Sequence, residues 1–238
     1  MTKAENCEDL GFGIFRYSGD ETESLKASGL ERFLDELWLP CSLSELSEEQ
    51  IFVINRHRES AIGADTRYET AQRSRARLAN LANATNGGFL VEIGCGKFPI
   101  GLPKDSYLGV DIDPEAIRLM RSKGYSVCLP SELSESCPKG VGTIVSSFAM
   151  HFKVEESLFD NLSSLSTPDG IIAFSLIIDN SLHFIELINN MSRRWPILQI
   201  VKTSIMSRRE YLIVMGKEKS MARVLTASVS ARTFDSVG

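Results

Sequence analysis

The stretch from Phe89 to Gly96 limits what this chain can fold into more than any other part of it. The apolar run Phe89–Ile93 carries an acid, Glu92, and is followed by two glycines separated by one residue. A second apolar run ends in Asp111, 15 residues after Gly96. Glycines allow a sharp turn and a close approach of the backbone to a ligand, and an acid at the end of the next parallel strand can accept hydrogen bonds from both hydroxyls of a ribose. The pattern predicts a nucleotide site on a parallel sheet.

Length and composition fit one α/β domain with some additional structure. The chain has 238 residues, 43% of them hydrophobic, and a formal net charge of -5. This length supports a large core, and the mild acidity gives no reason to expect nucleic acid or an anionic membrane as a partner. The first residues are polar and acidic, unlike a secretory signal, and the longest apolar stretch, 171–178, is too short to span a bilayer. The five cysteines form no C-x-x-C pair, so we expect a cytoplasmic protein without disulfides or structural zinc.

From residue 89 onward, apolar runs alternate with helical segments. Continuous apolar runs are typical of strands in a sheet that helices cover on both faces. Asp113 and Pro114 have the residue types of an N-cap and of a first helical position, and predict that a helix begins there. The segment between Gly96 and Tyr107 is too short for a three-turn helix, so we expect a loop or a single turn. The expected strands are the runs 89–93, 107–110, 126–129, 143–145, 171–178, 197–201 and 211–215.

Residues 1–82 are expected to form a helical lid. Segment 47–50 has the form of a capping box, and a further helix is expected from about residue 65 to residue 82. The domain with the glycine turn then extends over 83–219, and residues 220–238, rich in Ser and Ala, are expected to be a loosely ordered tail. The apolar residues that recur at the spacing of one helix face are Leu30, Phe33, Leu34, Leu37 and Trp38.

Two ligand classes could use the glycine turn, namely a dinucleotide or S-adenosylmethionine. A dinucleotide site needs a third glycine and a helix N-terminus for the pyrophosphate, but Gly96 is followed by Lys97-Phe98-Pro99. Glu92, before the first glycine, is a poor neighbour for a pyrophosphate and a good one for a ligand with an ammonium or sulfonium charge. The residues therefore favour S-adenosylmethionine.

Four segments occur in the order and spacing of one enzyme family. They are Val91–Gly96, Gly109–Glu115, Ser146–Phe152 and Leu165–Ile171. On these segments, residues 83–217 resemble the class I S-adenosylmethionine-dependent methyltransferases. The resemblance implies a mostly parallel sheet of seven strands with helices on both faces. Its last strand would be inserted antiparallel beside the fifth, so that the runs 197–201 and 211–215 form the terminal hairpin.

The resemblance also implies roles for individual residues. Asp111 would hold the ribose hydroxyls. Because the first crossover lacks a full helix, an arginine of the N-terminal region, Arg73 or Arg77, is a candidate for an anionic ligand group such as the cofactor carboxylate. The alternative is that these arginines lie on solvated helix faces. The residues expected around the methionine part of the cofactor are Glu92, Gly94, Cys95 and Gly96. Those expected around its adenine and sulfonium are Ile112, Pro130, Ser131, Ser147 and Phe148.

His151 is the candidate catalytic residue, since it follows the fourth strand, where acceptor and methyl group would meet. A base is required only for an acceptor that is protonated at neutral pH, such as an alcohol or an ammonium; the alternative role of His151 is to fix its loop by hydrogen bonds. Ser146 and Ser147 stand where metal-dependent relatives carry an acid, so we expect no catalytic metal. Cys95 has no histidine spaced to activate it in this loop, and is expected to be structural.

Together these features predict an enzyme that transfers a methyl group from S-adenosylmethionine to an O or N atom of a small molecule, such as a secondary metabolite. The lid would cover this acceptor, and its amphipathic helices could pair across a homodimer. Two alternatives stay open. One is a methyltransferase that acts on protein or RNA through the arginines at 51–80, 193–194 and 208–209, and the other is a non-catalytic regulator that binds an adenosyl ligand.

Overall fold

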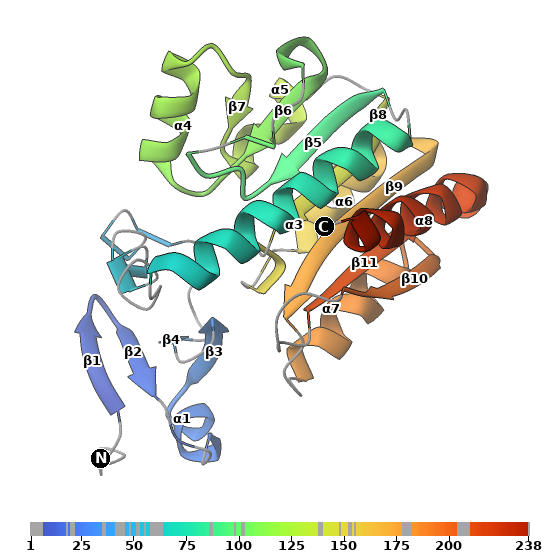
Figure 1. The fold of residues 1–238 in the computed structure, drawn as a ribbon. Helices are drawn as coiled ribbons and strands as arrows, with labels where there is room; N and C mark the ends of the chain where they lie inside the picture. Colours follow the sequence, from blue (N-terminus) through green and yellow to red (C-terminus); the bar gives the residue numbers. More distant parts are fainter. Residues whose placement is uncertain are drawn as a thin grey trace. The chain divides into compact units, whose positions relative to one another are not determined.

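Two units make up the chain (Figure 1). One holds residues 1–65 and 151–153, the other holds residues 66–150 and 154–238, and each is described by itself. The expected boundary at residue 82 is wrong because helix α3 (Ala64–Ala84) packs on the sheet of the second unit. The residues described in this computed structural model are 7–17, 19, 22–34, 37–40, 46–47, 49–50, 53–54, 56–57, 64–85, 88–97, 99–100, 103–137, 140–147, 149–151, 154, 156–177, 182–203 and 210–237.

The second unit is built on a seven-stranded sheet with the order β10-β11-β9-β8-β5-β6-β7. Strand β11 runs antiparallel to both of its neighbours, β9 and β10, and the other neighbouring pairs are parallel. The expected strands and the terminal hairpin are confirmed. Their bounds are β5 Phe89–Ile93, β6 Tyr107–Val110, β7 Val127–Cys128, β8 Val141–Ser147, β9 Ser166–Ile177, β10 Ile197–Lys202 and β11 Glu210–Gly216.

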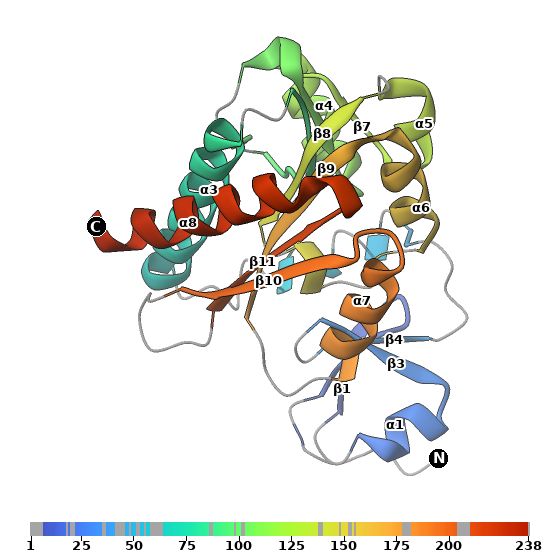
Figure 2. The same cartoon turned by 90° about the vertical axis from the view of Figure 1, so that its right-hand side faces the viewer.

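Helices cover both faces of this sheet (Figure 2). Helices α3 and α8 (Met221–Val237) pack their apolar side chains on one face. The other face is covered by α5 (Leu133–Ser136), α6 (Glu156–Leu165) and α7 (Leu182–Ser192). Burial on both faces explains why the strands are continuous apolar runs. Short 3-10 turns complete the unit: η1 Lys104–Ser106, η2 Pro130–Glu132, η3 Ala149–His151 and η4 Glu218–Ser220.

Local sequence signals explain how the chain passes from β5 to β6 and onward. Among its described residues, the crossover between these strands contains only η1, as expected for so short a segment. Helix α4 (Pro114–Ser122) begins where predicted, since the side chain of Asp113 accepts a hydrogen bond from the N–H of Glu115 and Pro114 takes the first position. Its Ile117 and Met120 pack beside β7.

The first unit contains a four-stranded antiparallel sheet with the order β1-β2-β4-β3. The helix expected over residues 30–38 is therefore wrong. Leu37 packs into one apolar cluster and Trp38 into another, which is the alternation of a strand. The capping box is confirmed, because Ser47 and Gln50 exchange hydrogen bonds of 2.9 and 3.2 Å. The elements are β1 Cys7–Gly11, β2 Ile14–Tyr17, α1 Glu23–Ala27, β3 Leu30–Leu34 and β4 Leu37–Pro40.

The expected loose tail after residue 220 is also wrong, because residues 221–237 form helix α8. Val224, Ala227 and Ala231 are fully buried and recur three and four residues apart, on one helix face. Their small side chains let the helix approach the sheet beside α3 without forming a strongly apolar run in the sequence.

Candidate functional site

The glycine turn lies at the carboxyl end of β5, between the ends of β6 and β8. Val110, the last residue of β6, accepts hydrogen bonds from the N–H groups of Gly94 and Cys95 at 2.7 and 3.3 Å. The chain leaves β5 toward β6 on one side and later returns to β8 on the other. Such a reversal of strand order is where α/β sheets bind ligands.

Two glycines give the turn its shape. Gly94 and Gly96 have φ angles of 70° and 56°, which residues with a side chain rarely adopt. A Cβ on Gly94 would collide with the Cβ of Ala149, whereas a Cβ on Gly96 would meet no atom within 4 Å. The backbone at Gly96 is therefore open to the approach of a ligand.

The carboxylate of Asp111 is held beside this turn. Its Oδ2 accepts a hydrogen bond from the N–H of Gly96 at 2.7 Å, and its Oδ1 accepts one from the N–H of Asp113 at 2.9 Å. A carboxylate can accept about four hydrogen bonds, so hydroxyl groups can bind it beside backbone donors. Asp111 thus has the chemistry to receive two hydroxyl groups.

Glu92 is fully buried, and the hydrogen bonds to it come from the protein. Its Oε2 accepts hydrogen bonds from the hydroxyl of Tyr107 at 2.6 Å and from the N–H of Ile100 at 3.2 Å, while its Oε1 accepts one from Nη2 of Arg75 at 2.9 Å. Burial raises the pKa of this carboxyl, and the charge of Arg75 and the hydrogen bonds oppose that rise. Glu92 therefore fastens the end of β5, and it has no exposed surface with which to touch a ligand.

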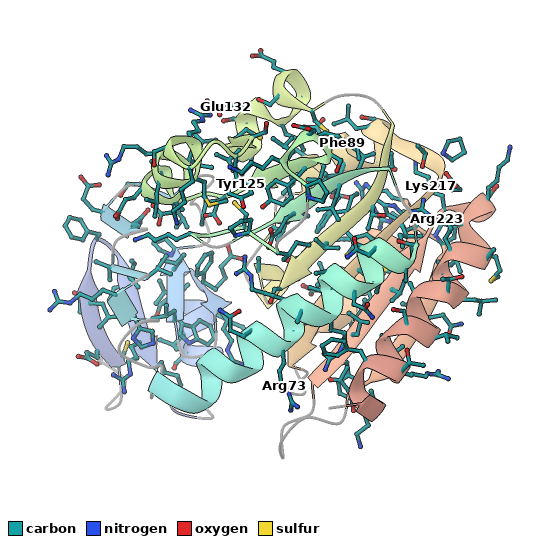
Figure 3. All side chains as sticks on the ribbon, turned by 45° about the horizontal axis from the view of Figure 1, so that its top comes forward. Arg73, Phe89, Tyr125, Glu132, Lys217 and Arg223 are labelled. Atoms are coloured by element: carbon teal, nitrogen blue, oxygen red, sulfur yellow. The ribbon has the colours of Figure 1, made fainter. Side chains whose placement is uncertain are left out.

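The arginine at this position is Arg75, which the sequence did not single out. Its Nη2 also donates to the carbonyl of Cys95 at 2.8 Å. Arg73 and Arg77 each lie two residues from Arg75 along α3. Two residues correspond to about 200° of rotation around the helix axis, so neither side chain leaves the helix in the direction of Arg75. Arg73 is exposed (Figure 3), and Arg77 is buried with its guanidinium over the ring of Phe234. The structure therefore does not bring Arg73 together with Glu92 and the turn.

A pairing rule could have identified Tyr107. In the parallel pair of β5 and β6, Leu90 is opposite Tyr107 and Glu92 is opposite Gly109. Residues two apart on a strand share a face, so Tyr107 and Glu92 share one face of neighbouring strands. The sequence contains no comparable signal for Arg75, because it does not fix the rotation of α3.

Cys95 is enclosed in the glycine turn. Its side chain is buried, and burial, with the charges of Asp111 and Glu92, raises the pKa of its thiol. A thiol that stays protonated is a poor nucleophile. Its Sγ lies 2.7 Å from the position that a Cβ on Gly109 would occupy, so a glycine on β6 makes room for it.

The loops after β6 and β7 complete this edge. Ile112 follows Asp111 with 41% of its surface exposed, which offers an apolar surface next to a polar one. Pro130 and Ser131 lie in η2, half-buried and exposed respectively. Glu132 is held within its own loop, because its Oε2 accepts hydrogen bonds from the N–H of Leu129 and from Arg121, both at 3.0 Å (Figure 3).

The end of β8 carries hydroxyl groups. Ser147 is half-buried, and its Oγ lies 3.4 Å from the Oγ of Ser74 on α3, which donates to Ser175 of β9 at 2.6 Å. Phe148 and the side chain of His151 lie outside the described residues, so their expected roles stay predictions.

A cavity of about 300 Å³ lies at the opposite end of the sheet, near the start of β9. Two of its cations serve the fold. Arg194 pairs with Glu156 at 3.1 Å and also with Asp160, and Lys217 (Figure 3) donates to the carbonyls of Ser163, in α6, and of Ser166, the first residue of β9. We therefore do not count this cavity as part of the site. Its lining residues are Pro168, Arg193, Arg194, Pro196, Lys217, Glu218 and Lys219.

Neither a metal-binding cluster nor a helix that could span a membrane occurs in the described part of the chain. No group of three or more His, Cys, Asp and Glu residues there is arranged to hold a metal ion. None of the helices in those ranges has both the length and the apolar character needed to span a bilayer.

No protein-family model matches the sequence, and no curated protein matches it. Among solved structures, a TehB-like methyltransferase from Corynebacterium glutamicum is 19% identical over 72% of this chain and 98% of its own, with a TM-score of 0.48. Magnesium protoporphyrin IX methyltransferase from Synechocystis, with bound S-adenosylmethionine, is 14% identical over 74% and 100%, with a TM-score of 0.48. The N-methyltransferase NodS from Bradyrhizobium japonicum is 15% identical over 68% and 97%, with a TM-score of 0.46.

The strand arrangement identifies the fold. The sheet has seven strands in the order β10-β11-β9-β8-β5-β6-β7, and β11 lies antiparallel between β9 and β10, as the resemblance implied for the last strand. The glycine turn and Asp111 follow the carboxyl ends of the neighbouring parallel strands β5 and β6. The second unit of this chain has the fold of the class I S-adenosylmethionine-dependent methyltransferases.

Proposed function

We propose that the chain binds S-adenosylmethionine across the carboxyl ends of β5 and β6 and transfers its methyl group to an O or N atom of a small molecule. When bound, this cofactor supplies a methyl group that its sulfonium activates. The observation that carries the proposal is the carboxylate of Asp111, which two backbone N–H groups hold beside the glycine turn at 2.7 and 2.9 Å.

The residues of this edge fit an adenosyl group. Asp111 can accept hydrogen bonds from both ribose hydroxyls, the exposed side chain of Ile112 can pack on adenine, and the open backbone at Gly96 leaves room for the chain of the cofactor. A dinucleotide fits less well. The described part of the first crossover has no α-helix whose N-terminus could receive a pyrophosphate.

The acceptor would meet the methyl group at the ends of β5 and β8. Methyl transfer needs the attacking atom at about 3 Å from the methyl carbon and in line with the bond that breaks. We assign Ser147 and Phe148 to the surroundings of the sulfonium, and His151 to the proton of an alcohol or ammonium acceptor.

Several of the arginines proposed for an RNA substrate are not available to it. An RNA substrate would need a basic surface, but Arg77 is buried, Arg75 is bound to Glu92, and Arg194 is paired with Glu156 and Asp160. Arg73 and Arg193 are exposed, so the salt dependence of acceptor binding decides between the two kinds of acceptor. The described cysteines Cys7, Cys95, Cys128 and Cys137 form no disulfide, which fits the reducing, cytoplasmic compartment that we propose. Pairing of two copies in a homodimer stays a prediction.

Calorimetry with S-adenosylhomocysteine tests the cofactor site. Asp111→Ala should weaken binding by roughly 1.5–3 kcal/mol for each hydrogen bond lost to the charged carboxylate. Asp111→Asn, which preserves the shape, should show a smaller loss. Asp105→Ala, an exposed acid in η1, is the matched control and should bind like the wild type. Equal affinity in all four proteins, or a preference of the wild type for NAD, contradicts the proposal.

A turnover assay tests whether the protein transfers the methyl group. Conversion of S-adenosylmethionine to S-adenosylhomocysteine in the presence of a small acceptor, and insensitive to salt, supports the proposal. A steep fall of acceptor binding with salt would indicate a nucleic acid instead, and absence of turnover with any acceptor would leave a binding protein. His151→Ala should lower turnover and spare cofactor affinity; unchanged turnover assigns His151 to the structure of its loop.

A further inference from the structure

One peptide group in the glycine turn is held from both sides. The carbonyl of Cys95 accepts a hydrogen bond from Arg75 at 2.8 Å, and the N–H of Gly96, on the other side of the same peptide bond, donates to Asp111 at 2.7 Å. The carbonyl and the N–H of a trans peptide are coplanar and point in opposite directions. Fixing the direction of one therefore fixes the direction of the other.

Arg75 is itself held by a buried group. Its Nη2 is shared between the Cys95 carbonyl and Glu92, and Glu92 is fixed by Tyr107 and by the backbone of Ile100. The side chain of Arg75 is 18% exposed and that of Glu92 is 0% exposed. The guanidinium thus joins the core of the sheet to the exposed turn.

We infer that Arg75 is a positioning residue for the carboxylate of Asp111, acting through the Cys95–Gly96 peptide. This inference rests on the proposed function, in which Asp111 binds the ribose. Glu92 and Tyr107 belong to the same chain of contacts. It leads from Tyr107, at the start of β6, through Glu92, Arg75 and the Cys95–Gly96 peptide to Asp111, which follows the end of the same strand. Glu92, the acid of the sequence motif, acts on the ligand only through Arg75.

The turn is built so that this peptide can rotate when it is not held. Gly94 and Gly96 stand on either side of Cys95, both with positive φ angles, and glycines have the widest choice of backbone angles. A rotated peptide would direct its carbonyl, in place of its N–H, toward the carboxylate of Asp111. Two acceptors then face each other, and the carboxylate moves away from the direction in which it receives the ribose.

Two ligands separate this role from a direct contact of Arg75 with the cofactor. S-adenosylhomocysteine has an amino acid end, and methylthioadenosine has the same nucleoside without it. Arg75→Met should weaken both ligands by the same factor, roughly tenfold or more, the factor that corresponds to one hydrogen bond to a charged group. Arg73→Met, the same change at an exposed position of the same helix, is the matched control and should change neither affinity by more than about twofold.

A second variant distinguishes a loss of ligand affinity from a failure to fold. Arg75→Met leaves the buried carboxylate of Glu92 without its cation, so the double variant Arg75→Met with Glu92→Gln removes the charge as well. The double variant should fold and still bind both ligands weakly. In a background of Asp111→Asn, the further change Arg75→Met should have a much smaller effect on methylthioadenosine, because coupled residues are not additive.

Each other outcome decides against the inference. Loss of S-adenosylhomocysteine affinity alone would mean that Arg75 contacts the amino acid end directly. Unchanged affinities would mean that Arg75 stabilises the fold without positioning Asp111. Additive effects of Arg75→Met and Asp111→Asn would mean the same. If the wild type binds neither ligand, the proposed function itself fails, and this result is distinguishable from the others.

Discussion

The hydroxyl of Tyr107 donates to the carboxylate of Glu92 at 2.6 Å, between neighbouring strands and out of contact with solvent. Burial raises the pKa of Tyr107, and the charge of Glu92 raises it further, so the hydroxyl keeps its proton and is the donor at neutral pH. The bond fixes the carboxylate on which Arg75 depends.

Tyr107→Phe should therefore lower the free energy of unfolding by roughly 1.5–3 kcal/mol, the value of a hydrogen bond to a charged group. Urea denaturation measures the change. Tyr125→Phe is the matched control, since Tyr125 meets Tyr107 edge-on through its ring, and we expect a change within about 0.5 kcal/mol. Equal losses in the two variants would show that the bond to Glu92 adds no stability.

Gly109→Ala should destabilise the fold by roughly 1–3 kcal/mol, because the added Cβ would lie 2.7 Å from Sγ of Cys95 and 2.9 Å from Cγ1 of Val127. Thermal or urea unfolding measures this. The shortest of these contacts is to Sγ of Cys95, so the same substitution in a Cys95→Ala background should cost less. If the two changes are additive, the thiol is not what excludes a side chain at residue 109.

The free energy of unfolding should fall as the pH rises from about 9 to 11. Burial raises the pKa of the thiols of Cys128 and Cys137 to about 11 each, so the unfolded chain loses these protons before the folded protein does. The stabilisation is fully present below the pKa of the unfolded thiols and is lost through this window, on the order of 2 kcal/mol per thiol. Urea denaturation at pH 8, 9.5 and 11 should show it, and the double variant Cys128→Ala with Cys137→Ala should show a flatter dependence. Equal slopes in the two proteins would assign the fall to other groups.

Replacing alanine by glutamate at two positions of helix α8 should have opposite effects on the melting temperature. Ala227→Glu would bury a carboxylate against the sheet, since Ala227 has no exposed surface, and should cost several kcal/mol or prevent folding. Ala222→Glu places the same residue at an exposed position in the first turn, where an acid is favourable. Circular dichroism melts compare the two. Similar melting temperatures would mean that α8 is not part of the core.

The sheet could be predicted because burial on both faces leaves a direct mark in the sequence. Its seven strands are apolar runs, and the acid, the glycines and Asp111 mark the strand ends. The helix predicted over residues 30–38 was wrong, because apolar residues at helical spacing in a short segment also fit two strands joined by a turn. Helix α8 was missed because alanines form its buried face, and they are weak markers in a sequence.

From the sequence we could predict only those residues of the site whose positions are fixed by the backbone. Asp111, Gly94 and Gly96 follow from strand ends and turn geometry. Arg75 does not, because three arginines lie two residues apart on α3, and only the rotation of the helix against the sheet selects the one that reaches Glu92. Rotation is set by the packing of Leu78 and Leu81, a property of the assembled core.

The position of β11 has a consequence for synthesis on the ribosome. This strand follows the other strands of the sheet in the sequence, yet it is not an edge strand, because it pairs with β10 on one side and β9 on the other. Until residue 216 has left the exit tunnel, the nascent β10 has no neighbour in the sheet and β9 keeps one side of its backbone unpaired. Folding of this domain therefore ends after translation of β11, and until then one edge of β9 is open to pairing with another chain.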